Sequence, residues 1–238
     1  MSALPQNIES IHPSLWHAAH LSRAHGRTVD TGYAEFSAQL PGGGWPLGAL
    51  VELLVQQEGS GEIRLLRPAL ATLAEKRSIV LAGPRQVPNA LAYGYLGVAP
   101  QRLLWLKPQK SADALWSAEQ ILKAGSCGAL LLWQQHMRSE ALRRLHLAAQ
   151  TSETLLIVLR PLACAQDSSP AALRLAVRPS IGGVQVELIK RKGPSVTEPI
   201  TIALTPSPIL FSPHRREPRR VVDVPAAGVI RAPLVAAP

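Results

Sequence analysis

The sequence predicts an α/β protein with a mostly parallel central sheet flanked by helices. Short apolar runs of about five residues alternate with helical segments between residues 49 and 160. Because these runs are apolar at nearly every position, they are typical of strands that are buried on both faces. The chain has 238 residues, of which 47% are hydrophobic. A domain of this size buries roughly 70% of its unfolded surface, so its core needs neither disulfides nor a metal.

Two helices and a glycine-rich loop are expected before the sheet. The first helix begins near Ser14, a residue suited to a helix N-terminus, and Gly26 ends it. The second helix covers Tyr33–Leu40, with apolar side chains on one face. The segment Pro41–Pro46 contains three consecutive glycines and is expected to form a tight irregular loop.

The alternating pattern predicts eight strands, with a helix after each of the first four. The strands are expected at Ala49–Val55, Ser78–Ala82, Arg102–Leu106, Gly128–Trp133, Leu155–Leu159, Ala171–Val177, Val184–Ile189 and Ile200–Leu204. The helices are expected at Ile63–Glu75, Asn89–Leu96, Ala112–Ala124 and Ser139–Ala149. A helix between two strands returns the chain to the same end of the sheet, so strands joined in this way run parallel.

The end of the chain differs in composition from the rest. Seven prolines punctuate the sequence from Thr205 onward, and little in it can be buried. Such a segment is predicted to be mostly disordered. The chain therefore divides into an N-terminal segment with a helix (1–30), a core domain (31–204) and a basic, proline-rich tail (205–238).

Basic residues gather toward the same end. The net charge of the chain is +9, and residues 190–238 hold eight Lys or Arg against three Asp or Glu, which is +5. This excess favours phosphate-rich or acidic protein partners. No aromatic residue lies between the tail arginines to stack on bases. The candidate partner-binding side chains of the tail are Arg215, Arg216, Arg219 and Arg220.

Several classes of protein are disfavoured by what the sequence lacks. No apolar run approaches the roughly 18 residues of a membrane span, and nothing before His20 has the pattern of a signal peptide. Cys127 and Cys164 have neither disulfide nor zinc spacing, which indicates buried thiols in a cytoplasmic protein. His17 and His20 could share a helix face, but no third ligand accompanies them. We therefore expect no membrane contact and no metal.

The loop after the first core strand has the position of a phosphate-binding loop without its chemistry. Its sequence is Gln56-Gln57-Glu58-Gly59-Ser60-Gly61-Glu62-Ile63. Nucleotide loops need glycine N–H groups, a lysine for the phosphate charge, and a Ser or Thr hydroxyl for magnesium. Glu62 stands in place of the lysine and Ile63 in place of the hydroxyl. Even at an effective dielectric constant near 20, two like charges about 4 Å apart cost on the order of 4 kcal/mol.

Two further positions lack nucleotide chemistry. The fourth strand ends in Trp133, where an Asp would orient magnesium, and the second is followed by Gly83-Pro84-Arg85, which offers no carboxylate to activate water. The degenerate nucleotide loop and its surroundings are thus defined by Gln56, Gly59, Ser60, Gly61, Glu62, Ile63 and Trp133. We expect no cofactor and no catalysis.

Segments on both sides of this loop resemble a known family. Thr31–Tyr33, Leu40–Gly48 and Val51–Leu53 are similar to the entry into the RecA recombinase core. His12–Trp16 and the triple-glycine loop resemble more closely the ImuA family, the RecA-like accessory proteins of SOS-induced mutagenic translesion DNA synthesis in bacteria. The resemblance extends, through less specific motifs, to about Leu204. It implies a RecA-like core and a place in the bacterial cytoplasm, near the nucleoid through partners.

The resemblance also implies partners and the residues that meet them. The partners are RecA, an ImuB-like Y-family protein and an error-prone replicative-type DNA polymerase. Lys190-Arg191-Lys192 resembles the lysine pair with which RecA reaches the ATP of a neighbouring protomer, and Leu15 and Trp16 lie on a helix that in RecA docks on the adjacent protomer. These five residues form the candidate RecA interface. Both DNA-binding loops of RecA are short in this chain, so direct DNA binding is expected to be weak.

These observations predict a non-catalytic accessory protein that binds RecA and caps or limits its filaments. Two alternatives stay open. A SulA-like cell-division inhibitor would act on the division GTPase without RecA. A DNA-dependent ATPase or recombinase would have to bind ATP against the charge of Glu62.

Overall fold

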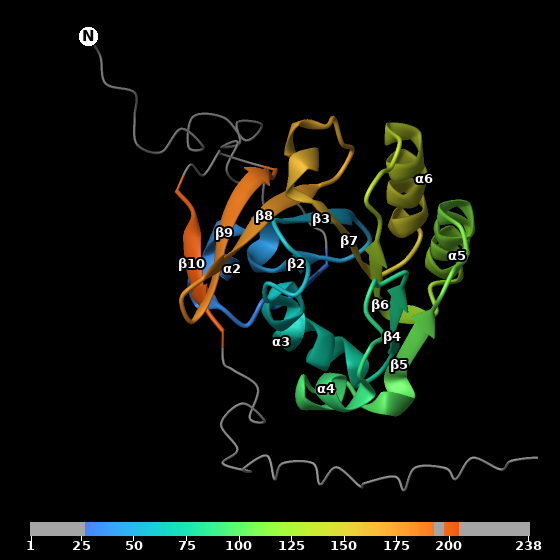
Figure 1. The fold of residues 1–238 in the computed structure, drawn as a ribbon, viewed down its shortest axis with the longest axis horizontal. Coiled ribbons are helices and arrows are strands. Elements are labelled where there is room, and N and C mark those ends of the chain that lie inside the picture. The colour runs from blue at the N-terminus through green and yellow to red at the C-terminus, as the bar shows by residue number, and fades with distance from the viewer. Residues whose placement is uncertain (1–26, 193–197, 205–238) are drawn as a thin grey trace, which may run out of the picture. The chain divides into compact units, whose positions relative to one another are not determined.

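The computed structural model describes residues 27–192 and 198–204, which form an α/β core (Figure 1). Two of the predicted features lie outside the described residues. These are the N-terminal helix, with Leu15 and Trp16, and the tail, with Arg215, Arg216, Arg219 and Arg220.

One eight-stranded sheet organises this core. Its strands are β3 (Leu50–Val55), β4 (Ser78–Ala82), β5 (Leu103–Leu106), β6 (Cys127–Trp133), β7 (Leu155–Pro161), β8 (Leu173–Ser180), β9 (Gly183–Lys190) and β10 (Ile200–Ala203). Their order in space is β10-β9-β8-β3-β7-β6-β4-β5. The strands from β8 to β5 in this order are all parallel, whereas β9 and β10 add antiparallel pairs at one edge. Because β3 lies inside the parallel part, the loop that follows it opens at the carboxyl end of neighbouring strands.

Helices cover both faces of the sheet (Figure 1). The helices are α2 (Ala34–Gln39), α3 (Glu62–Ala74), α4 (Ala90–Tyr95), α5 (Ser111–Ala124) and α6 (Ser139–Gln150). Side chains of α2, α3 and α4 share one core with Val51, Leu53 and Val55 of β3. Side chains of α5 and α6 share the other core with Leu50. This division follows from the alternation of side chains along a strand, and it places the two helix groups on opposite faces.

The structure confirms the predicted α/β class and the mostly parallel sheet. Every strand and helix that was predicted within the described residues is present, with ends that differ by at most three residues. The largest difference is at β8, which continues to Ser180 instead of ending at Val177. The extra residues pair with the start of β9, as Arg178 does with Gln185. Hydrogen bonding to β9 thus makes β8 longer than its apolar run.

A small two-stranded ribbon was not predicted. The segment expected to be an irregular loop contains a 3-10 turn, η2 (Pro41–Gly43), and then β2 (Trp45–Pro46), which pairs with β1 (Thr28–Val29). Trp45 is fully buried and meets Phe36 of α2 edge to face, with ring centroids 5.3 Å apart. Gly44 permits the close pairing, since a Cβ there would lie 2.4 Å from the carbonyl oxygen of Val29. The ribbon therefore depends on contacts that local sequence patterns do not encode.

A buried charge network ties three strands together. Glu52 of β3 is fully buried, and its carboxylate accepts hydrogen bonds from Arg160 Nη1 of β7 at 2.8 Å and from Arg174 Nε of β8 at 2.7 Å. Arg160 also pairs with Asp167 at 3.0 Å. Arg174 donates to the carbonyl oxygens of two residues in η4 (Leu162–Gln166). The network thus fixes the short connection between β7 and β8 against the sheet.

Candidate functional site

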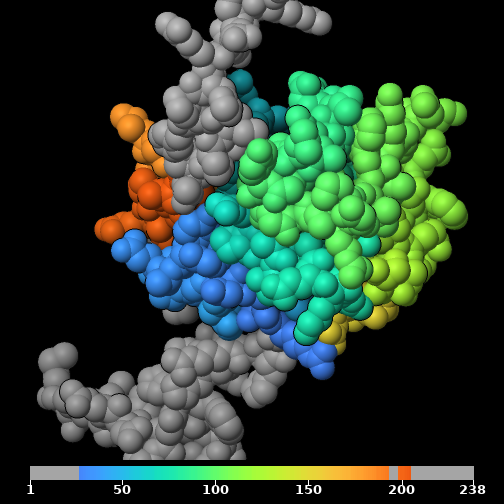
Figure 2. All heavy atoms as spheres, turned by 90° about the horizontal axis from the view of Figure 1, so that it is seen from below, coloured from blue at the N-terminus to red at the C-terminus, as the bar shows by residue number. Residues whose placement is uncertain are grey.

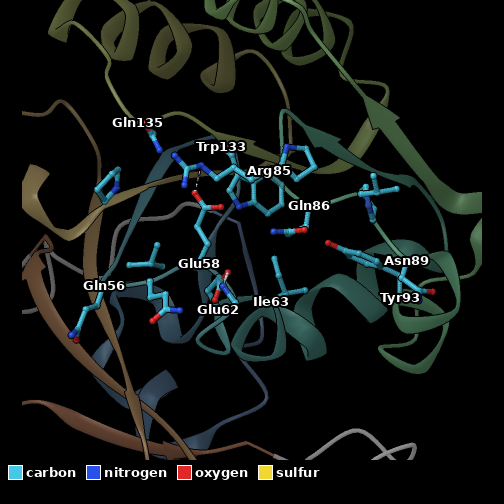
Figure 3. Close-up of a pocket in the computed structure, with 17 residues that line it drawn as sticks. Gln56, Glu58, Glu62, Ile63, Arg85, Gln86, Asn89, Tyr93, Trp133 and Gln135 are labelled. Carbon is cyan, nitrogen blue, oxygen red and sulfur yellow. Dashed lines mark hydrogen bonds and ion pairs between the residues drawn. The ribbon is translucent and has the colours of Figure 1, made fainter. Parts of the chain in front are cut away.

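The degenerate loop opens on a cavity of about 600 Å³ at the carboxyl end of the sheet. The cavity lies between the loop after β3 and the segment after β4, and Trp133 at the end of β6 forms part of its wall (Figure 3). Of the seven residues that were predicted here, five line the cavity: Gln56, Gly59, Glu62, Ile63 and Trp133. Ser60 belongs to the same loop, where its hydroxyl donates to the carbonyl oxygen of Gln57.

The side chain of Glu62 turns back into its own loop. Glu62 is the first residue of α3 and is only 2% exposed. Its carboxylate accepts hydrogen bonds from the backbone N–H of Gly59 at 2.7 Å and of Gly61 at 3.1 Å. A negative charge at a helix N-terminus is favourable, and backbone N–H groups at such a site are the usual donors to phosphate. The carboxylate therefore occupies donors that a bound phosphate would need.

The loop has the backbone geometry of an anion cradle. Gly59 and Gly61 both have positive φ, at 84° and 113°. Glycine reaches these angles without steric cost. At Gly61 a side chain would also meet Val184 and Leu204, because a Cβ there would lie 3.0 Å and 2.9 Å from their methyl groups. The glycines thus point their backbone N–H groups into the loop, where the acceptor is the Glu62 carboxylate of the same chain.

The two residues that were predicted to stand in place of magnesium ligands pack as apolar side chains in the structure. Ile63 packs against the core below α3, and the side chain of Trp133 is only 9% exposed. Neither side chain carries an oxygen that could coordinate a cation. Within residues 27–192 and 198–204, no group of three or more His, Cys, Asp or Glu is placed to hold a metal ion.

An ion pair crosses the cavity. Arg85, which follows β4, approaches Glu58 of the loop with 3.6 Å between Nε and Oε1, and Gln135 lies close to the same guanidinium (Figure 3). Glu58 was not predicted as a site residue, and Arg85 was noted only because no carboxylate stands there. The composition of the loop gave no signal for this pairing, because the two residues follow β3 and β4, and β7 and β6 lie between these strands in the sheet.

Tyr93 lines the cavity from the side of α4 (Figure 3). It comes from α4, whose first turn is capped by Asn89, with the side-chain oxygen accepting from the N–H of Leu91 at 3.0 Å and of Ala92 at 3.2 Å. Burial raises the pKa of the Tyr93 phenol to about 12, and the negative charge of Glu62 adds to this shift. Because the folded state holds the phenolic proton more tightly than the unfolded state, Tyr93 stabilises the fold below pH 10.

We expect the stabilisation of the fold by the protonated Tyr93 phenol to be lost as the pH rises from about 10 to about 12. A pKa shift of about 2 units corresponds to roughly 3 kcal/mol. Tyr93→Phe should therefore flatten the pH dependence of the free energy of unfolding over that range, as measured by urea denaturation at several pH values. The matched control is Tyr95→Phe, which changes an exposed tyrosine two residues away. A wild-type curve that is already flat between pH 10 and 12 would contradict the expectation.

The basic segment Lys190-Arg191-Lys192 lies at the opposite end of the sheet from the loop. Because β9 runs antiparallel to β8, its last residue, Lys190, pairs beside Arg174 near the start of the parallel strands. Lys190 Nζ donates to the carbonyl oxygen of Ser169 at 2.7 Å, and Arg191 donates to that of Gln39. The structure therefore does not bring this segment into one site with the degenerate loop.

A second cavity, of about 420 Å³, lies beside the basic segment. His146 of α6 lines it together with Lys190 and Lys192. Burial lowers the pKa of the His146 imidazole, and the positive charges of Lys192 and Lys190 lower it further. The backbone N–H of Leu50 lies 3.4 Å from His146 Nδ1. The second cavity thus lies at the basic end of the sheet and is lined by Lys190 and Lys192.

No protein-family model and no curated protein matches the chain. None of the helices in the described part of the chain combines the length and the apolar character that a bilayer crossing requires.

Proposed function

We propose that this chain is a non-catalytic, RecA-like accessory protein of SOS-induced mutagenic translesion DNA synthesis, of the ImuA type. The observation that carries the proposal is the Glu62 carboxylate, which accepts hydrogen bonds from two backbone N–H groups of the loop. A loop that holds its own anion, next to Ile63 and Trp133 in place of magnesium ligands, favours a role other than ATP hydrolysis. The mostly parallel sheet with helices on both faces is compatible with a RecA-like core.

The proposed partners follow from the resemblance. They are RecA, an ImuB-like Y-family protein and an error-prone replicative-type polymerase, met in the bacterial cytoplasm. The tail arginines at 215, 216, 219 and 220 remain candidates for binding one of them.

The separation of the loop from the basic segment suggests how RecA would be limited. A RecA filament grows because each protomer presents ATP to lysines of the next. This chain has exposed Lys190 and Lys192 at one end of its sheet, and at the other end a loop that is occupied by Glu62. Such a protein could accept the ATP-bearing face of a terminal RecA protomer and present no ATP of its own. We propose that it caps RecA filaments in this way.

The test is the affinity for RecA of a Lys190→Ala/Lys192→Ala variant. In the presence of ATP and single-stranded DNA, we expect the dissociation constant to rise about tenfold or more, because the charges facing the RecA nucleotide are lost. Surface plasmon resonance on immobilised RecA filaments measures the change. Arg191 is left intact because its guanidinium donates to the carbonyl oxygen of Gln39 at the end of α2.

The matched control is Lys76→Ala/Lys123→Ala. It removes two exposed lysines, Lys76 on the turn after α3 and Lys123 on α5. We expect this control to bind RecA as the wild type does. Equal affinities of the wild type and the Lys190/Lys192 variant would refute the capping mode. Binding to the division GTPase without binding to RecA would favour the SulA-like alternative instead.

A further inference from the structure

One surface segment combines exposure with a complete lack of charge. The sixteen residues Gln86–Gln101 contain no Lys, Arg, His, Asp or Glu, and twelve of them are exposed. The segment includes α4 and runs to the 3-10 turn η3 (Pro100–Arg102), which contacts α4. Exposed protein surface normally carries many charges, and depletion of charge is a mark of protein interfaces.

Large apolar side chains project from this segment. The exposed fraction is 71% for Val87, 73% for Leu91 and 47% for Tyr95. Leu91 and Tyr95 are four residues apart on α4 and so lie on one side of the helix. Trp105 of β5, 40% exposed, belongs to the same face of the sheet, because it pairs with Leu81 in the core below α3 and α4. In the view of Figure 2, the green residues of this part of the chain form a continuous area toward the viewer.

We call Val87, Leu91, Tyr95 and Trp105 the α4 face. Groups of exposed apolar side chains surrounded by polar residues are typical of interaction sites. The cavity described above adjoins this face, because Tyr93 of α4 forms one of its walls and Val87 lines it. A partner that lies on α4 could therefore place one apolar side chain in the cavity.

Three basic residues, Arg85, Arg102 and Lys107, flank the uncharged segment and Trp105 along the chain, and we call them the basic rim. Arg85 precedes the uncharged segment and Arg102 ends it. Lys107 lies with its Nζ 5.9 Å from the ring centroid of Trp105. Within the described residues, neither Arg102 nor Lys107 makes an ion pair, so their charges are available to a partner.

From this arrangement we infer that the α4 face docks a protein segment whose apolar side chains are flanked by Asp or Glu. Carboxylates beside the apolar contacts would pair with Arg102 and Lys107, which adds affinity and orientation. A second copy of this chain fits less well, because a two-fold contact through α4 would bring the same basic rim from each copy together, in a chain of net charge +9. The inference rests on the proposed docking role but not on RecA as the partner.

The experiment selects peptides from a random 16-residue library displayed on phage, with the full chain as bait. We expect enriched peptides with apolar residues spaced by three or four and with neighbouring Asp or Glu. Measured by fluorescence anisotropy, these peptides should bind Leu91→Glu at least about tenfold more weakly than wild type. The matched control is Leu147→Glu, since Leu147 is also exposed, at 56%, but lies on α6 at the other face of the sheet.

A second variant tests the charges. Arg102→Glu/Lys107→Glu should bind the same peptides about tenfold more weakly than wild type, and synthetic peptides with Lys in place of Asp or Glu should not bind wild type.

The inference is overturned if nothing is enriched, if the enriched peptides lack acidic residues, or if they bind Leu91→Glu as tightly as wild type. It is also overturned if sedimentation shows that wild type self-associates and that Leu91→Glu abolishes this. Peptide selection and RecA binding are measured separately, so each can fail without the other.

Discussion

Replacing Glu52 by glutamine is expected to lower the free energy of unfolding by about 3–5 kcal/mol. Arg160 and Arg174 both donate to the Glu52 carboxylate, and the Arg160 and Arg174 side chains are 1% and 6% exposed. Glutamine has nearly the same shape but no charge, so two buried guanidinium groups would lose their shared counter-charge. The amide N–H groups would also face donors instead of acceptors. Removal of one member of a buried charge network is costly for these reasons.

Urea denaturation of wild type and Glu52→Gln measures this loss. The matched control is Glu187→Gln, which removes the carboxylate partner of Arg178 in a half-exposed pair on neighbouring strands. Because solvent screens that pair, we expect the control to lose less than about 1 kcal/mol. Equal losses for the two variants would show that Glu52 does not stabilise the sheet through its charge.

Replacing Glu62 by alanine is expected to empty the loop and to let it bind phosphate groups. The N–H groups of Gly59 and Gly61 would lose their acceptor, and the repulsion of a phosphate by the carboxylate would end. That repulsion is on the order of 4 kcal/mol at 4 Å and an effective dielectric constant near 20. Since 1.4 kcal/mol is a factor of ten, we expect pyrophosphate to bind Glu62→Ala at least about tenfold more tightly than wild type.

Isothermal titration calorimetry with pyrophosphate and with Mg-ATP measures the gain. Glu62→Gln is the informative control, because its amide oxygen can still accept from the loop without carrying charge. An intermediate affinity for this variant would separate occupation of the donors from repulsion. We expect no ATP hydrolysis in any variant, since lysine and magnesium ligands are still lacking. Wild type that binds Mg-ATP as tightly as Glu62→Ala would refute our interpretation of the loop.

Much of the fold could be predicted because the strands of the parallel part are apolar at most positions. Runs such as Leu155–Leu159 can be recognised as buried strands without knowing which strands lie beside them. The ribbon of β1 and β2 could not be predicted, because two-residue strands have no periodicity. It exists because Trp45 packs on Phe36 and because Gly44 allows the backbone of Val29 to come close.

The candidate site could be predicted in position but not in arrangement. The sequence places Glu62 where a lysine belongs, which indicates repulsion, but not that its carboxylate would bond to the loop itself. The Glu52 network was missed although Glu52 interrupts a buried apolar strand, which is a visible signal of a buried partner. Identifying Arg160 and Arg174 as those partners requires the order of the strands, and this order depends on contacts between distant parts of the chain.

The carboxylate of Glu62 has a consequence for how such a protein would respond to the energy state of a cell. In an ordinary nucleotide-binding protein the loop has an empty form and a filled form, and the ratio of ATP to ADP decides between them. In this chain α3 begins on an anion that is covalently part of the chain. Under the function proposed above, a change in the concentration of adenine nucleotides would therefore leave the loop in the same form. The protein would then present the same surface to its partners when the cell is starved as when it is well supplied.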